Sequence, residues 1–208
     1  MKKQFLMVGV IGATMLLAAC EKPPVAQAAG VSDVLPVAKA EGKEYQIDTA
    51  ASKITWIGTK ITGKHNGTIN LKSGSVFVKD GNIVAGKFIA DMPSIDDKDL
   101  SGEYQAKLNK HLRSEDFFDV VKFPEGIFEI SSVEKAGNGF TVKGNLTLKG
   151  VTHGVTFDAE IQSDKGAPRL ATANFNIDRK KWGIVYPGKP DDLISDTVNL
   201  ALDLRIKK

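Results

Sequence analysis

Alternation of apolar and polar residues dominates the chain from Tyr45 onward. In residues 140–148, 154–161 and 197–206, every second side chain is apolar and its neighbours are polar or small. A period of two places successive side chains on opposite faces of a β-strand, so each segment predicts a strand with one buried face. Weaker alternation extends the prediction to residues 54–60, 75–79, 83–92, 127–133 and 170–178. The pattern predicts an all-β domain of about eight strands.

Turn residues between several of these strands predict antiparallel hairpins. Glycine, asparagine or aspartate residues, which tolerate positive φ, occur in each of Asp80-Gly81-Asn82, Gly137-Asn138-Gly139 and Asp164-Lys165-Gly166. Short loops of this kind join antiparallel neighbours. Such strands can bury their apolar faces in a sandwich or in a closed barrel, and a period of two does not distinguish the two folds.

One segment, residues 101–112, has a helical pattern. Tyr104, Leu108 and Leu112 recur at four-residue spacing, and Ser101 is a suitable N-cap because its hydroxyl can accept an unpaired backbone N–H. Ser114 can cap a further short turn that carries Phe117 and Phe118. A helical insertion in an all-β domain commonly covers an edge or an opening.

The N-terminus has the pattern of an export signal. Lys2 and Lys3 precede an uncharged apolar stretch, residues 5–17, which is too short to span a bilayer. The stretch ends in Leu17-Ala18-Ala19-Cys20, which resembles the cleavage and acylation site of bacterial lipoproteins, and Cys20 is the only cysteine. We expect residues 1–19 to be a signal peptide and Cys20 to carry a lipid that anchors the protein to a membrane.

The next segment, residues 20–43, is expected to be a flexible tether. It is rich in alanine and proline and has no sustained apolar periodicity. Residues 44–208 then form one domain. Cleavage after residue 19 removes two of the 28 basic residues and no acid, which leaves 26 basic against 25 acidic residues. This balance argues against a nucleic-acid partner, whose phosphates call for a large basic patch.

Several motifs resemble the YceI-like lipid-binding family. They are Tyr45-Gln46-Ile47-Asp48, the run from His111 to Val120 followed by Phe123-Pro124, the run from Gly144 to Thr152, and the run from Ile177 to Ile184. The resemblance spans about residues 45–206, although Ala51 replaces a usual histidine and Trp182 a frequent phenylalanine. It implies an extended eight-stranded antiparallel lipocalin-like barrel with a short helical insertion. It also implies a long apolar channel that holds an isoprenoid chain.

The alternation itself assigns the inward faces of such a barrel. The predicted inward residues are Phe88, Val142, Leu146, Phe157, Phe175, Val198, Leu200 and Leu202. Small residues on these faces indicate unfilled volume, namely Ala85, Gly144, Ala159 and Ala173. The candidate ligand-binding residues are Trp56, Phe88, Val142, Leu146, Phe157 and Phe175 in the channel, with His111, Arg113, Arg179 and Trp182 near an opening.

Basic residues offer a candidate head-group site. Arg179, Lys180 and Lys181 can bind a phosphate, since an arginine pairs with phosphate oxygens through two donors. His111 and Arg113, at the end of the predicted helix, are also candidates for binding this phosphate. The structural alternative is a solvated hairpin end for the first group and helix capping for the second.

Metal and catalytic chemistry have little support in the sequence. His65, His111 and His153 are far apart, and the one pair at helical spacing, His111 with Glu115, is interrupted by Ser114. The acidic run Asp96, Asp97, Asp99 and Glu103 is interpreted as solvated and favourable to the helix dipole. No nucleophile elbow, phosphate loop or zinc-protease motif is present. We expect no metal, no cofactor and no enzymatic activity.

The expected function is a noncatalytic carrier or store of a long isoprenoid lipid, a quinone or a polyprenyl phosphate, in the cell envelope. Glu21 after the acylated cysteine favours the outer membrane, because an aspartate there often retains lipoproteins at the inner membrane of enteric bacteria. Two alternatives stay open: an envelope enzyme acting on such lipids, and a stress or interaction module with a solidly packed barrel. The oligomeric state is not fixed, and a homodimer is left open.

Overall fold

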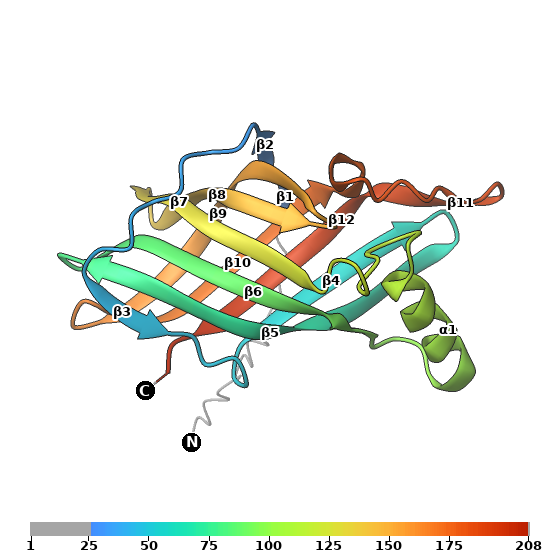
Figure 1. The fold of residues 1–208 in the computed structure, drawn as a ribbon, viewed down its shortest axis with the longest axis horizontal. Helices are drawn as coiled ribbons and strands as arrows, with labels where there is room; N and C mark the ends of the chain where they lie inside the picture. The colour runs from blue at the N-terminus through green and yellow to red at the C-terminus, as the bar shows by residue number, and fades with distance from the viewer. Residues whose placement is uncertain (1–25, 208) are drawn as a thin grey trace, which may run out of the picture.

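The computed structural model describes residues 26–207, and these form a closed eight-stranded antiparallel β-barrel (Figure 1). Each strand pairs with its neighbours around the barrel, and pairing of β9 with β10 closes it. The strands in spatial order are β12 (Asp192–Arg205), β4 (Lys53–Lys60), β5 (Gly63–Lys79), β6 (Asn82–Asp97), β7 (Glu125–Ala136), β8 (Gly139–Leu148), β9 (Val151–Asp164) and β10 (Ala167–Asp178). The predicted barrel is confirmed, and the sandwich is excluded.

The barrel is elongated because its strands are long. β5 has 17 residues and β6 has 16, whereas strands of globular proteins usually have about 3–10. Tight turns at Asp80-Gly81 and Lys165-Gly166, with positive φ at all four residues, join the long strands at one end. A third tight turn, Gly137-Asn138, joins β7 to β8, so all three hairpins that the sequence predicts are confirmed. We call this end, where β5–β6, β7–β8 and β9–β10 turn, the mouth.

A single helix, α1 (Gly102–Arg113), covers the opposite end, which we call the plugged end (Figure 1). The helix begins and ends within one residue of its prediction, but the Ser101 side chain makes no capping hydrogen bond. Leu112 is buried, whereas Tyr104 is 74% exposed, so only part of the predicted apolar stripe faces the barrel. Ser114 ends the helix, and its hydroxyl donates to the carbonyl of His111.

The prediction of a flexible tether is wrong for residues 26–42, which we call the strap. Within the strap, β1 (Gln27–Ala28) pairs with β10 and β2 (Gly30–Ser32) pairs with β9. The strap then crosses the outside of the barrel and leads into β3 (Lys43–Gln46), which pairs with β5 (Figure 1). The predicted signal peptide, residues 1–19, and Cys20 lie outside the described residues.

The strap is held because it satisfies backbone groups that the barrel leaves open. β9 and β10 pair only as far as Ala159 and Ala173, and β1 and β2 fill the space where the two strands then diverge. The buried side chain of Asn145 accepts from the Leu35 N–H and donates to the Leu35 carbonyl, both at 2.8 Å. Composition typical of a linker therefore does not prevent this segment from being part of the wall.

Two short elements complete the fold. The 3-10 helix η1 (Arg179–Trp182) follows β10, and β11 (Gly188–Lys189) pairs with the start of β12. Across residues 26–207, the only α-helix, α1, is too short and too polar to cross a bilayer.

Candidate functional site

An apolar cavity of about 240 Å³ lies inside the barrel. All eight barrel strands contribute to its lining, for example through Trp56, Ile69, Phe88, Phe128, Val142, Phe157, Phe175 and Leu200. Among the described residues that line it, Thr172 carries the one hydroxyl and Arg179 the one charged side chain. A lining with so few polar groups favours a ligand that is itself apolar over most of its length.

The predicted inward faces are confirmed. Phe88, Val142, Leu146, Phe157, Phe175, Val198, Leu200 and Leu202 all line the cavity, as do the small residues Ala159 and Ala173. Ala85 and Gly144 do not line it. At Gly144 an added Cβ would lie 2.5 Å from Cζ of Phe128, so a neighbouring ring already fills the space that the glycine leaves.

Four phenylalanines form an arc across the middle of the cavity. The ring centroids of Phe88 and Phe128 are 6.2 Å apart, those of Phe128 and Phe157 are 5.6 Å apart, and Phe157 stacks on Phe175 at 4.2 Å. Sequence alternation identified three of these rings and missed Phe128. Ile127 and Phe128 are adjacent apolar residues, and both line the cavity, so a period of two could not assign a single inward residue there.

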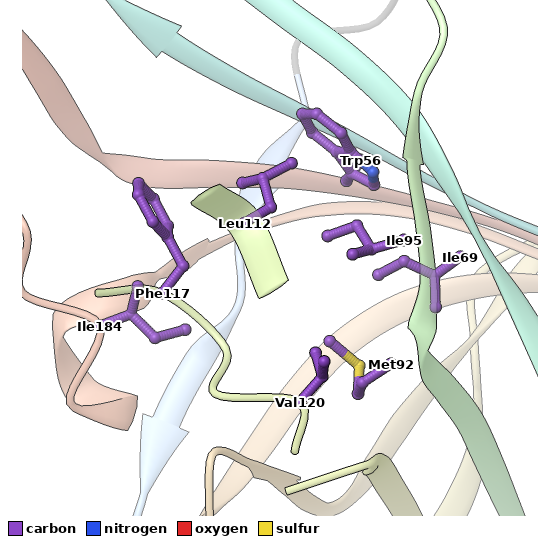
Figure 2. Close-up of a cluster of buried hydrophobic side chains, with 8 residues drawn as sticks. All are labelled: Trp56, Ile69, Met92, Ile95, Leu112, Phe117, Val120 and Ile184. Atoms are coloured by element: carbon purple, nitrogen blue, oxygen red, sulfur yellow. The ribbon is translucent and has the colours of Figure 1, made fainter. Parts of the chain in front are cut away.

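The plugged end is filled by side chains from α1 and the segment that follows it. Leu112, Phe117 and Val120 pack with Trp56, Ile69, Met92, Ile95 and Ile184 in one buried cluster. Figure 2 shows Leu112 of the helix beside Trp56 and Ile95, with Val120 next to Met92. A chain that enters the barrel therefore meets a closed apolar wall here.

The mouth is less tightly sealed. Several lining residues near it are half-buried, namely Ile83, Val133, Ile161, Leu170 and Leu204, although Pro168 is buried. The hairpin tips approach one another, because a Cβ added at Gly166 would lie 4.0 Å from the Cα of Gly81. The cavity is thus a blind channel with one closed end and one end bordered by hairpins.

A family model described as YceI-like domain matches residues 45–206, which cover the whole barrel. The chain belongs to this family. A UPF0312 protein of Yersinia pestis (strain Pestoides F) is 36% identical over 125 residues, 57% of this chain and 62% of the relative. One from Yersinia enterocolitica is 42% identical over 84 residues, 38% of this chain and 44% of the relative. The aligned part of the chain spans about three fifths of the length of the first of these relatives.

Solved structures of the YceI-like fold resemble this barrel. BcnA of Burkholderia cenocepacia is 20% identical, with a TM-score of 0.62, and the match covers 78% of this chain and 99% of BcnA. A polyisoprenoid binding domain from Saccharophagus degradans, described as implicated in plant cell wall breakdown, is 14% identical with a TM-score of 0.57. That match covers 78% of this chain and 97% of the domain. At these identities the likeness shows the fold alone.

Arg179 lines the channel of this YceI-like barrel, but its donors are committed to the backbone. Its side chain is 3% exposed and donates to the carbonyls of Ile184, Ser195 and Ile194 at 2.6, 2.9 and 3.3 Å. Burial lowers the pKa of the guanidinium below its ordinary value, partly offset by Asp196 and Asp178. The arginine fixes η1 and the chain after it against β12.

Three other predicted site residues support the plugged end without lining the channel, so the prediction that they lie near an opening is wrong. Trp182 is fully buried and its Nε1–H donates to the Leu146 carbonyl at 2.9 Å. His111 lies between the rings of Phe117 and Tyr186, and its Nε2 is 3.0 Å from Asp116, not paired with Glu115. Arg113 donates to the Ile95 carbonyl at 2.8 Å.

The acidic run before α1 differs from its interpretation as a solvated group. Asp97 has a fully buried side chain, and it lies beside His65 and Asp99. Pairing of β5 with β6 brings these residues together, since Gly67 is the register partner of Asp97. No spacing in the sequence indicates this contact.

Proposed function

We propose that this protein is a noncatalytic lipid-binding protein of the cell envelope that holds a single long isoprenoid chain, as a quinone or a polyprenyl phosphate, in the barrel channel. The observation that supports this most strongly is the blind apolar channel, to which all eight strands contribute. Each buried methylene contributes about 0.8 kcal/mol, so a long chain gains affinity without specific polar contacts. The polyisoprenoid-binding neighbour of the same fold supports the class of ligand.

The proposed orientation places the tail toward α1 and the head group at the mouth. The plugged end presents apolar side chains, and the donors of Arg179 are already bound to carbonyls. A phosphate there would compete with these carbonyls for the guanidinium and bring charge into an apolar site, at a large desolvation cost. Thus Phe88, Val142, Leu146, Phe157, Phe175 and Trp56 contact the chain in this proposal, whereas Arg179, His111, Arg113 and Trp182 have structural roles.

The proposed membrane anchor is the acylated Cys20, with the outer membrane as the favoured site. The strap changes how such an anchor acts, because only the residues between Cys20 and Ala26 separate the lipid from the barrel wall. Those residues span about 20 Å at most. β1 is parallel to β10 and runs from the mouth side toward the plugged end. β1 pairs with Phe175 and Asn176 of β10, so we propose that the anchor keeps the wall around β10 close to the bilayer, with the chain entering β1 from the mouth side.

The test is the lipid content of protein purified from its own envelope. Organic extraction followed by mass spectrometry should yield about one isoprenoid per chain, enriched over its share of total envelope lipid. The Ala159→Phe variant, prepared in parallel, should retain much less. A lipid profile equal to that of the bulk membrane in both preparations would overturn the proposal.

A further inference from the structure

His65, Asp97 and Asp99 form a cluster at the junction of β5, β6 and α1. His65 belongs to β5, Asp97 is the last residue of β6, and Asp99 lies in the link to α1. Nδ1 of His65 is 2.9 Å from Oδ2 of Asp99 and 4.0 Å from Oδ2 of Asp97. One donor atom from each residue lies within 4.8 Å of the other two. In the part of the chain that the structure describes, this is the one group of three such side chains.

The buried carboxylate of Asp97 gives independent evidence for a ligand, because one of its oxygens has no hydrogen-bond partner among the described residues. Its side chain is 0% exposed, and Oδ1 accepts from the Leu100 N–H at 2.7 Å. Its Oδ2 has no hydrogen-bond partner within residues 26–207. A buried carboxylate oxygen without a partner is unfavourable, and burial accordingly raises the pKa of Asp97, with the neighbouring Asp99 adding to the effect. The one basic side chain on the link, Lys98, pairs with Asp96 instead of Asp97.

The three side chains are held in place from both sides. Oδ1 of Asp99 accepts from the Asn66 N–H at 2.6 Å, which leaves Oδ2 toward His65. Helix α1 fixes the backbone of Asp97, because Oδ1 of Asn109 accepts its N–H and Nε2 of Gln105 donates to its carbonyl. Outer contacts of this kind orient the ligands of metal sites.

We propose that His65, Asp97 and Asp99 bind a divalent first-row transition-metal ion, with Zn²⁺ the best fit. One imidazole nitrogen and two carboxylate oxygens are zinc ligands, and three protein ligands leave a fourth position for water. Zinc bonds of about 2.0–2.2 Å place tetrahedral ligand atoms about 3.4 Å apart, a value between the two separations from Nδ1 in the cluster. Ca²⁺ and Mg²⁺ prefer sets made only of oxygen.

The ion would balance two carboxylates with its double charge and satisfy the unpaired oxygen of Asp97. It would also fasten the link before α1 to β5, and so hold the plug in the barrel. Ile95, two residues before Asp97, lines the channel, so the site lies next to the lipid cavity without being part of it. The inference does not depend on the proposed lipid function.

The experiment uses the full chain, purified in detergent without a histidine tag and stripped with a chelator. Titration with Zn²⁺ followed by calorimetry should give one site per chain. At a hundredfold excess over its Kd, Zn²⁺ should raise the unfolding temperature by about 5–10 °C. Asp97→Asn, which keeps the shape but removes the charged ligand, should weaken binding at least about 100-fold.

The matched control is the other histidine–carboxylate pair on the protein. Nε2 of His111 lies 3.0 Å from Asp116, but this pair has no buried third carboxylate. His111→Gln should leave the affinity for Zn²⁺ unchanged, and His65→Gln should abolish the site. No Zn²⁺ binding by the stripped protein, or equal affinity in Asp97→Asn and the unaltered chain, would overturn the proposal. If Asp97→Asn does not fold, His65→Gln tests the site instead, because Zn²⁺ should then no longer raise the unfolding temperature of the variant.

Discussion

The apolar channel and the His65–Asp97–Asp99 cluster are neighbours in space, but their environments are opposite. Ile95 lines the channel, and Asp97, two residues later on the same strand, is buried among polar groups. The channel wall has many interchangeable apolar contacts and retains empty volume. The cluster has few contacts, each directional, and retains one unsatisfied oxygen. The first arrangement suits a ligand recognised by length and shape, and the second suits a small ion recognised by its charge.

The largest expected effect comes from filling the channel. Ala159→Phe places a ring in volume that an isoprenoid needs, and excluding about four methylenes at 0.8 kcal/mol each weakens long-chain binding on the order of 100-fold. The free energy of unfolding should change by less than about 1 kcal/mol, because the site is hollow. Binding is followed by quenching of tryptophan fluorescence by quinones, since Trp56 lines the channel.

Ala85→Phe is the matched control for that substitution. Ala85 is 3% exposed but does not line the channel, so the added ring overpacks a filled core. We expect a loss of about 1–3 kcal/mol of stability, with the preference for chain length unchanged. Similar stability losses in both variants, with binding unaffected in both, would mean that the barrel is solid around Ala159.

A smaller change in the free energy of unfolding should separate a buried polar side chain that has hydrogen-bond partners, Asn145, from one that lacks a partner, Asp97. Asn145→Ala removes two hydrogen bonds to Leu35 and should destabilise the protein by about 1–3 kcal/mol, measured by denaturant unfolding. In the metal-free protein Asp97→Asn keeps the bond from Leu100 and loses no partner at Oδ2, so it should change stability by less than about 1 kcal/mol. The reverse order would contradict the hydrogen bonding described for both sites.

The two regions also differ in how far the sequence could predict them. The channel wall could be predicted because a strand repeats its burial every second residue, so Val198, Leu200 and Leu202 indicate one face without knowledge of the partners. The exception was β7, where adjacent apolar residues hid the orientation of Phe128. That the strands close into a barrel could be predicted only from the family resemblance, because alternation is the same in a sandwich and in a barrel.

The cluster and the strap could not be predicted in this way. His65 and Asp97 meet through the register of β5 and β6, which is a tertiary property, and an acidic run before a helix is usually solvated. In the strap, main-chain pairing with β9 and β10 determines the structure, and main-chain pairing imposes little pattern on side chains. Arg179 lines the cavity at the plugged end and not near an opening as predicted, because its three carbonyl partners belong to segments whose positions the sequence does not specify.

The most direct test of the central claim is the affinity of the lipid-free protein for a series of isoprenoid quinones that share one head group and differ in chain length. The blind channel predicts that Kd falls by at least about tenfold with each added isoprene unit until the chain reaches the plug, and then stays constant. In Ala159→Phe the constant value should be reached at a shorter chain. An affinity independent of chain length in the unaltered protein would contradict the account.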